Sequence, residues 1–232
     1  LTGGFESLYT MAAAQLEKPH PEEEAQFLTA AMRGLLCMKS MAEKFAETAE
    51  KKLKTATDAE EIANLKRIRE SAVWTPWHAP RNFYEALNTL AFIRTAVGAL
   101  EGVGYNSFGR PDVELLPFYE RDLADGTLTK ESAYELTQAF LLTWDCHYDH
   151  DMQMVGYADH ELENTYTLCG CDAYGLPFSN HLTQMFLPAT PDHKIIFQKI
   201  NVPPSSASPY TFPDWADADL IRGPSSILYQ NH

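Results

Sequence analysis

The chain has 232 residues, and its 32 Asp and Glu against 18 Lys and Arg give a formal net charge of −14. Most of this imbalance lies between positions 101 and 200, where 16 acidic side chains stand against 5 Lys and Arg. A surface of this sign repels phosphate groups, so nucleic acid and anionic membranes are excluded as expected partners. Four cysteines without a C-x-x-C pair predict neither a disulfide scaffold nor a zinc or iron–sulfur site, and we expect a reducing cytoplasm.

The first residues, LTGGFESLYT, have neither a basic segment nor an apolar run, which predicts no signal peptide. No apolar run approaches the length of about 18 residues that a membrane span needs. Because the first residue is Leu rather than Met, we expect a processed or partial chain.

Two helices that form a hairpin are predicted over 22–73. Over 22–54 apolar residues recur at steps of three and four, as in an amphipathic helix. This stripe consists of Phe27, Ala31, Leu35, Met38, Ala42, Phe45, Ala49 and Leu53. Asp58, followed three residues later by Glu61, is typical of a capped helix start and predicts the second helix.

A second helical region is predicted over 80–150, after the proline-broken connector at 74–80. One helix begins near Phe83. Ala-Asp-Gly at 124–126 predicts a turn, and Thr129 is a candidate N-cap for the next helix. The apolar stripe of that helix is Ala133, Leu136, Phe140, Leu141, Trp144 and Tyr148.

The pattern changes to alternating strands and helices over 160–232. Four short β-branched and aromatic runs predict strands, and a helix is expected near 180–187 between the first two of them. The predicted strands are 165–169, 195–197, 200–202 and 227–229. The fold class is therefore α/β and rich in helix.

Four stretches resemble the glycyl radical enzymes of the pyruvate formate-lyase family, in the family's order. Residues 80–87 (PRNFYEAL) are similar to the family's P-R-x-F-x-E-A-L helix start. Residues 107–112 (SFGRPD), with 117–122 and 126–129, are similar to its S-F/L-G-R-x-D series. Residues 167–175 (TLCGCDAYG), with 180–183 (NHLT), resemble its G-G strand end and following helix start, and 225–232 resembles its S-x-x-[FY]-x-N-D segment.

This resemblance implies a ten-stranded barrel of two halves surrounded by helices, of which residues 1–232 would supply about half at most. The family's radical glycine lies in an R-V-x-G-Y loop that this sequence does not contain, and its radical cysteine lies beyond the [FY]-x-N-D segment. We therefore expect an internal fragment of one pyruvate formate-lyase-like domain, without a catalytic residue or cofactor of its own. The resemblance implies that the parent carries a protein-based glycyl radical installed by an S-adenosylmethionine-dependent radical activase, and it allows a homodimer.

The resemblance also points to residues of a substrate pocket. The loop at Tyr105, Asn106 and Ser107 corresponds to one where dehydratase-type members hydrogen-bond substrate hydroxyls; a structural turn is the alternative. Glu163, Thr165 and Thr167 precede the G-G-like strand end, where alternation points every second side chain inward.

Cys169 falls on the first glycine of the family's G-G pair. A cysteine in a strand is usually a small buried hydrophobe, and a pocket-lining thiol is the alternative. Arg110 and Asp112 are interpreted as a structural ion pair.

The densest polar stretch is 144–151 (WDCHYDHD). His147 and Asp151 share a helix face, a spacing that suits a solvated helix end, a general acid or base in the pocket, or a divalent metal ion. The solvated helix end is favoured, and no metal is predicted.

Two functional hypotheses follow. In the first, the parent abstracts hydrogen by a thiyl radical from a small polar substrate, as a C–C lyase of the formate C-acetyltransferase kind or as a dehydratase, and this fragment alone is inactive. In the second, the chain is a helical binding or interaction module without radical chemistry.

Overall fold

The computed structural model describes residues 1–101, 108–145, 164–171, 174, 176, 178–192, 198–202 and 227–229. The chain divides into two compact units, Leu1–Ala96 and Val97–His232. Helix α4 (Phe83–Glu101) begins in the first unit and ends in the second. The α/β, helix-rich class predicted from the sequence is confirmed by this order of elements.

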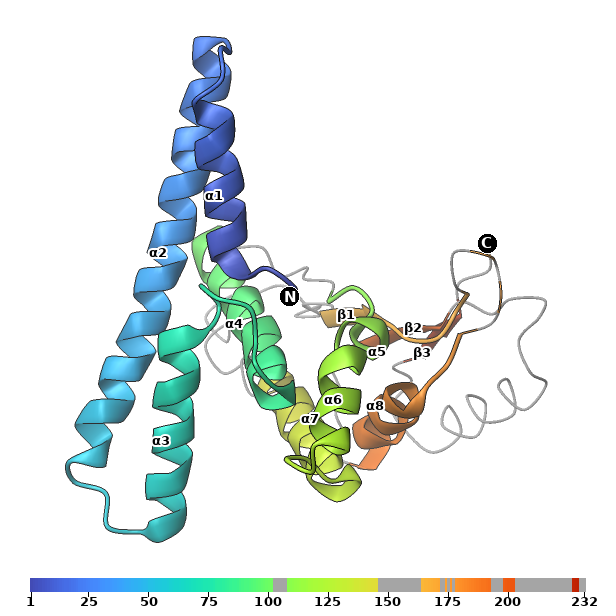
Figure 1. Ribbon diagram of the computed structural model, residues 1–232. Coiled ribbons are helices and arrows are strands. Elements are labelled where there is room, and N and C mark those ends of the chain that lie inside the picture. The colour runs from blue at the N-terminus through green and yellow to red at the C-terminus, as the bar shows by residue number, and fades with distance from the viewer. Residues whose placement is uncertain are drawn as a thin grey trace, which may run out of the picture. The chain divides into compact units, whose positions relative to one another are not determined.

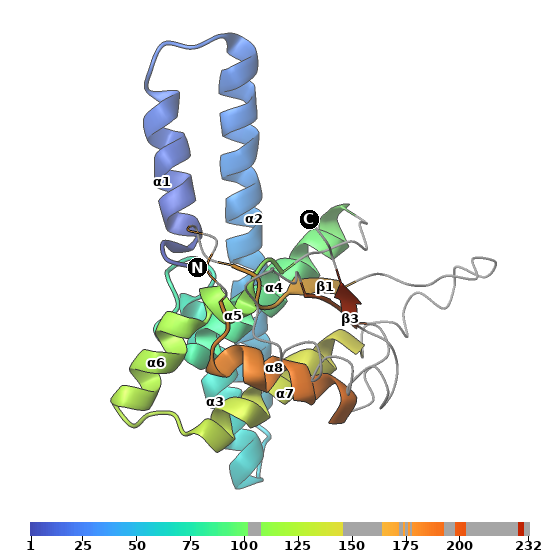
Figure 2. The same ribbon diagram turned by 90° about the vertical axis from the view of Figure 1, so that its right-hand side faces the viewer.

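The first unit is helical. Its elements are α1 (Gly4–Leu16), α2 (Glu22–Leu53), α3 (Ala59–Trp74) and the start of α4. Figures 1 and 2 show α1 and α3 each lying antiparallel to α2, along different halves of this long helix. The hairpin expected over 22–73 is therefore confirmed as α2 and α3, whereas α1 was not predicted from the sequence.

Small side chains form the buried face of α2. Ala42, Ala46 and Ala49 are buried, which allows a neighbouring helix to approach closely. The predicted apolar stripe is only partly confirmed, because Phe27 is 70% exposed and Phe45 is 52% exposed. Neighbouring helices cover only part of the surface of a helix of 32 residues, so the stripe extends beyond the buried strip.

The predicted helix starts have the expected local bonds. The backbone N–H of Glu61 donates to the Asp58 carboxylate at 2.8 Å, which caps α3. At the start of α4, the N–H of Glu85 donates to Asn82 Oδ1 at 2.9 Å. The carboxylate of Glu85 is buried and accepts the backbone N–H of Arg81 at 2.7 Å and its guanidinium Nε at 3.0 Å.

Glycine is required at the start of α1. Gly4 has a φ of 61°, and a Cβ there would lie 2.4 Å from the carbonyl oxygen of Trp77. This close approach lets the N–H groups of Phe5 and Glu6 donate to the carbonyl oxygens of Pro76 and Trp77 at 2.9 and 2.8 Å. The 74–80 connector therefore anchors the first helix.

The second unit combines helices with a parallel sheet. Its helices are α5 (Pro111–Glu114), α6 (Leu116–Ala124), α7 (Lys130–Asp145) and α8 (His181–Asp192). The strands β1 (Asn164–Thr167), β2 (Gln198–Val202) and β3 (Ile227–Tyr229) pair in that order, with Tyr166 opposite Ile200 and Ile200 opposite Ile227. The strands predicted at 200–202 and 227–229 are confirmed, and the one at 195–197 lies outside the described residues.

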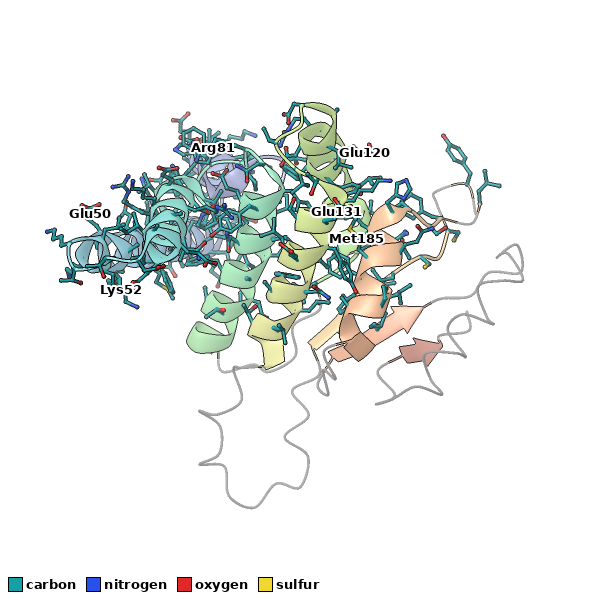
Figure 3. All side chains as sticks on the ribbon, turned by 90° about the horizontal axis from the view of Figure 1, so that it is seen from below. Glu50, Lys52, Arg81, Glu120, Glu131 and Met185 are labelled. Carbon is teal, nitrogen blue, oxygen red and sulfur yellow. The ribbon has the colours of Figure 1, made fainter. Side chains whose placement is uncertain are left out.

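An aromatic chain forms the core of this unit. Phe108 contacts Phe140 of α7 edge-on at 6.2 Å between ring centroids, Phe140 contacts Phe186 of α8 at 6.4 Å, and Phe186 contacts Tyr166 of β1 at 5.7 Å. Helices α7 and α8 lie side by side, as the view from below shows (Figure 3). The face of β1 that carries Tyr166 is thus packed on α8.

Thr129 caps α7 as predicted. Its hydroxyl accepts the backbone N–H of Ser132 at 3.1 Å, and the Ser132 hydroxyl accepts the Thr129 N–H at 3.0 Å in return. The predicted turn ends at Gly126, whose φ is 78°. Among the helices of the described ranges, none combines the length and apolar character that crossing a membrane requires.

Candidate functional site

A buried polar cluster lies where β1 ends. It brings together three segments that are distant in the sequence: residues 108–112, which lead into and begin α5; residues 168–171, which follow β1; and the start of α8 at 180–183. We call its members Arg110, Asp112, Cys169, Asn180 and Thr183 the Asp112 hub. In parallel sheets, functional residues gather at the carboxyl ends of the strands, which is where this hub lies.

The side chain of Asp112 is the centre of the hub and is fully buried. Its Oδ2 accepts the backbone N–H of Cys169 at 2.8 Å and the hydroxyl of Thr183 at 3.0 Å. Its Oδ1 faces Arg110, with 3.9 Å between Oδ1 and Nε. The ion pair predicted for Arg110 and Asp112 is therefore present, at the outer limit of distance for such a pair.

Arg110 forms its closer bonds with the strand end. Its Nη2 donates to the carbonyl oxygen of Cys169 at 2.6 Å, and its Nη1 donates to that of Cys171 at 3.2 Å. The guanidinium also lies over the ring of Phe178, 5.0 Å from the centroid. Arg110 thus ties the loop to the end of β1 more than it neutralises Asp112.

Asn180 and Thr183 join α8 to the hub. The Thr183 N–H donates to Asn180 Oδ1 at 3.0 Å, and the Asn180 N–H donates to the Thr183 hydroxyl at 3.1 Å, as in a capping box. Asn180 Nδ2 then donates to the carbonyl oxygen of Asp112 at 2.7 Å. The same two side chains that cap the helix therefore also attach it to the loop.

Burial dominates the electrostatics of Asp112. Removal from water raises the pKa of this carboxyl, and the hydrogen bonds from Cys169 and Thr183 and the charge of Arg110 only partly oppose the rise. The Cys169 thiol is affected in the same direction: burial, and after it the nearby Asp112, raise its pKa to about 12. A thiol with this pKa stays protonated at neutral pH and is a poor nucleophile.

Cys169 differs from its predicted setting in one respect. It is buried, as expected, at 4% exposure. The predicted strand 165–169 is two residues too long, because β1 ends at Thr167 and Cys169 has a φ of 62°. Residues other than glycine adopt this left-handed backbone conformation at a cost of about 1 kcal/mol or more. The resemblance places a glycine here, which accounts for the left-handed backbone that the cysteine has to adopt.

The other predicted pocket residues divide into two groups. Thr165 and Thr167 are half-buried and lie on the face of β1 opposite Tyr166, since side chains alternate along a strand. The remaining ones lie outside the described residues: Tyr105, Asn106, Ser107, His147 and Glu163. Of the eight predicted residues, the hub thus contains Cys169, and Thr165 and Thr167 lie on the strand that leads into it.

Sequence patterns did not single out Asp112, Asn180 or Thr183 as residues of a pocket. The available signal was their position, because each lies in one of the family-like motif stretches at 107–112 and 180–183. Within the described residues no three His, Cys, Asp or Glu side chains gather so that they could hold a metal ion. The stretch from His147 to Asp151 lies outside that part of the chain.

Comparison with known proteins connects this site to a family. The family model described as "Pyruvate formate lyase-like" matches residues 1–232. An isethionate sulfite-lyase from Oleidesulfovibrio alaskensis is 29% identical over 63% of this chain and 18% of its own length. A trans-4-hydroxy-L-proline dehydratase from Clostridioides difficile is 30% identical over 42% of this chain and 12% of its own length.

Solved structures agree in fold. A structure of 1,2-propanediol dehydration in Roseburia inulinivorans matches all of this chain with a TM-score of 0.86 and 22% identity, and the match covers 30% of that chain. The glycerol-bound B12-independent glycerol dehydratase from Clostridium butyricum matches 99% of this chain with a TM-score of 0.85 and 20% identity, again over 30% of that chain. The chain thus spans under a third of the proteins that it matches. It belongs to the pyruvate formate lyase-like family of glycyl radical enzymes.

Proposed function

We propose that this chain forms part of the barrel wall and of the substrate pocket of a glycyl radical enzyme that acts on a small polar substrate. The observation that carries the proposal is the Asp112 hub, which gathers three segments from two of the family-like stretches around one buried carboxylate, next to the end of a parallel strand. An enzyme that reacts at strand ends needs these ends held in place. The fold that the chain shares with the solved glycyl radical enzymes supports this role.

The pocket residues of the proposal are those predicted from the sequence. Thr165 and Thr167 supply hydroxyls that can donate to and accept from a polar substrate, on the face of β1 turned away from α8. Cys169 would border them as a protonated, unreactive thiol. Tyr105, Asn106, Ser107, His147 and Glu163 complete the proposed set.

The reaction class proposed is elimination, by a lyase or a dehydratase. The names of the relatives support it, since they describe a sulfite-lyase and dehydratases of hydroxyproline and sulfopropanediol. Carbon–carbon cleavage remains the alternative, and a decarboxylase subunit among the relatives keeps it open. Formate acetyl transfer finds no counterpart in these names.

The radical is proposed to belong to the parent polypeptide. Glycyl radical enzymes use a protein-based radical, and we propose that an S-adenosylmethionine-dependent activase installs it on a glycine outside residues 1–232. The residues of this chain would bind and orient the substrate and keep water from it, and none of them would carry the radical.

The test uses the full open reading frame that contains this sequence, produced without oxygen together with a radical activase. We expect a glycyl doublet in the electron paramagnetic resonance spectrum and turnover of a small hydroxylated substrate such as a diol, hydroxyproline or isethionate. Replacing Thr167→Val should raise KM about 10-fold, because a hydroxyl bond to substrate is lost, whereas Thr167→Ser keeps the hydroxyl and should stay near the parent value. If the full-length protein, produced without oxygen together with the activase, shows neither a glycyl doublet nor turnover, the proposal is contradicted and the binding-module hypothesis is favoured.

A further inference from the structure

Cys169, just after β1, is hydrogen-bonded through both its N–H and its carbonyl oxygen to side chains of the 108–112 segment. The N–H of Cys169 donates to Asp112 at 2.8 Å, and its carbonyl oxygen accepts from Arg110 at 2.6 Å. Arg110 and Asp112 are two positions apart in the 108–112 segment, where Arg110 precedes α5 and Asp112 lies in its first turn. The two bonds fix the orientation of the peptide planes on either side of Cys169.

The orientation of these peptide planes sets the direction of the backbone after β1. Cys169 has a φ of 62° and Gly170 a φ of 94°, so the backbone reverses its local twist immediately after the strand. The carbonyl oxygen of Gly170 then accepts the N–H of Phe178 at 2.8 Å. A left-handed cysteine persists only where its surroundings hold it there, and Arg110 and Asp112 are the side chains that do so.

The same loop also lies along the backbone of β1 itself. The N–H of Phe108 donates to the carbonyl oxygen of Thr165 at 2.9 Å, and the N–H of Thr167 donates to the carbonyl oxygen of Gly109 at 2.9 Å. Gly109 has a φ of 61°, which turns the loop toward Arg110. The loop therefore contacts β1 at Thr165 and Thr167, the residues whose hydroxyls face the proposed pocket, and then at Cys169.

We propose that Arg110 and Asp112 are positioning residues for the substrate: by fixing the end of β1, they set where the Thr167 hydroxyl lies in the pocket. Neither side chain needs to touch the substrate, since both act through the strand. The inference rests on the proposed function, because it assigns the hub to substrate binding by that same site.

The first test is a set of kinetic measurements on the activated full-length enzyme. Asp112→Ala removes the oxygen that accepts from Cys169 and Thr183, whereas Asp112→Asn keeps one such oxygen and is its matched control. Arg110→Lys keeps the charge but cannot donate to two carbonyl oxygens at once. We expect Asp112→Ala and Arg110→Lys each to raise KM about 10-fold with a much smaller change in kcat, and Asp112→Asn to stay near the parent KM.

A double-mutant cycle separates positioning from general damage. In a Thr167→Val background the hydroxyl is gone, so adding Asp112→Ala should raise KM by less than about 2-fold. Glu120→Gln on α6 is the control, because it removes an exposed charge in the same unit (Figure 3). An Asp112→Ala effect of equal size in both backgrounds, or a loss of kcat with unchanged KM, would overturn the proposal.

A second measurement does not depend on activity. Hydrogen exchange of the 164–171 segment should be at least about 10-fold faster at the Cys169 amide in Arg110→Lys and Asp112→Ala than in Glu120→Gln. If neither variant changes this exchange, the loop does not hold the strand end and the inference fails. A wild-type enzyme that shows no radical and no turnover counts instead against the proposed function, and the exchange result then decides on the loop alone.

Discussion

The two units bury a carboxylate in contrasting ways. In the first unit Glu85 is satisfied by Arg81, four residues away in the same helix start. In the second unit Oδ2 of Asp112 accepts hydrogen bonds from Cys169 and Thr183, which are 57 and 71 residues away. The first is a local motif that completes one helix, whereas the second joins three segments and depends on the whole unit being folded.

The contrast predicts that Asp112 matters more for stability. Asp112→Ala leaves the Cys169 N–H and the Thr183 hydroxyl without their buried acceptor and the Arg110 charge without its nearby carboxylate, so the free energy of unfolding should fall by about 3 kcal/mol. Denaturant unfolding followed by circular dichroism measures it. Asp112→Asn, which keeps the acceptor, should lose much less; an equal loss would mean that volume rather than bonding matters.

Glu85→Ala should be the next largest change. It removes the acceptor for the Arg81 N–H and guanidinium, and we expect a fall of about 2 kcal/mol in the same unfolding measurement. Glu85→Gln retains one acceptor oxygen and should recover about half of this loss. If Glu85→Ala lowers the free energy of unfolding more than Asp112→Ala does, the expectation is wrong that the long-range bonds of Asp112 stabilise the protein more than the local bonds of Glu85.

The backbone strain at Cys169 can be measured with a matched pair. Cys169→Ala removes only the sulfur and keeps the left-handed strain, whereas Cys169→Gly also removes the Cβ that causes it. The glycine variant should therefore be the more stable of the two by about 1 kcal/mol, in thermal or denaturant unfolding. A more stable alanine variant would show that the strand end relaxes without strain.

Stability should also depend on pH through Asp112. Because burial raises the folded-state pKa of this carboxyl, the folded protein binds more protons there than the unfolded chain between the two pKa values. Its contribution to stability is therefore fully present below the unfolded pKa and is lost as the pH rises through the folded one. Asp112→Asn lacks this titration, so wild type should lose stability relative to it as the pH rises above about 4. A difference that does not vary with pH would contradict the assigned direction.

The smallest effect is expected at the surface of the first unit. Glu50 of α2 and Arg69 of α3 pair at 2.8 Å, but both side chains are exposed and screened by water. Figure 3 shows Glu50 at the outer side of the helical hairpin. Glu50→Ala should leave the unfolding midpoint unchanged within error, with Lys52→Ala as control; a clear loss would mean that this exposed pair matters as the buried ones do.

The same contrast explains what could be predicted from sequence. The caps at Asp58 and Thr129 could be predicted, because a helix start is decided by residues within one turn. The family-like motifs located the residues of the hub, but no local rule connects Asp112 to Cys169. The left-handed backbone of Cys169 was not predicted either, and the side chains that hold it there lie nearly 60 residues earlier in the sequence.

The sequence predictions that were missing or wrong for the first unit failed for a different physical reason. The start of α1 has a glycine rather than a side chain that could cap it, and its anchoring comes from carbonyl oxygens at 76–77. Phe27 and Phe45 fit the periodicity of a buried stripe, yet burial depends on where neighbouring helices end. Periodicity predicts the face of a helix but not how far its partners cover it.

The separations that the Asp112 hub spans have a consequence for the order of folding. Bringing together residues so far apart in the sequence costs chain entropy, and this cost is offset only once the contacts have formed. We therefore expect these bonds to form after the local helices. Before these bonds form, the carboxylate of Asp112 is more stable in contact with water. Its burial marks the step at which α8 packs onto β1. Protection of the Cys169 amide would therefore appear late in refolding and report that the unit has been completed.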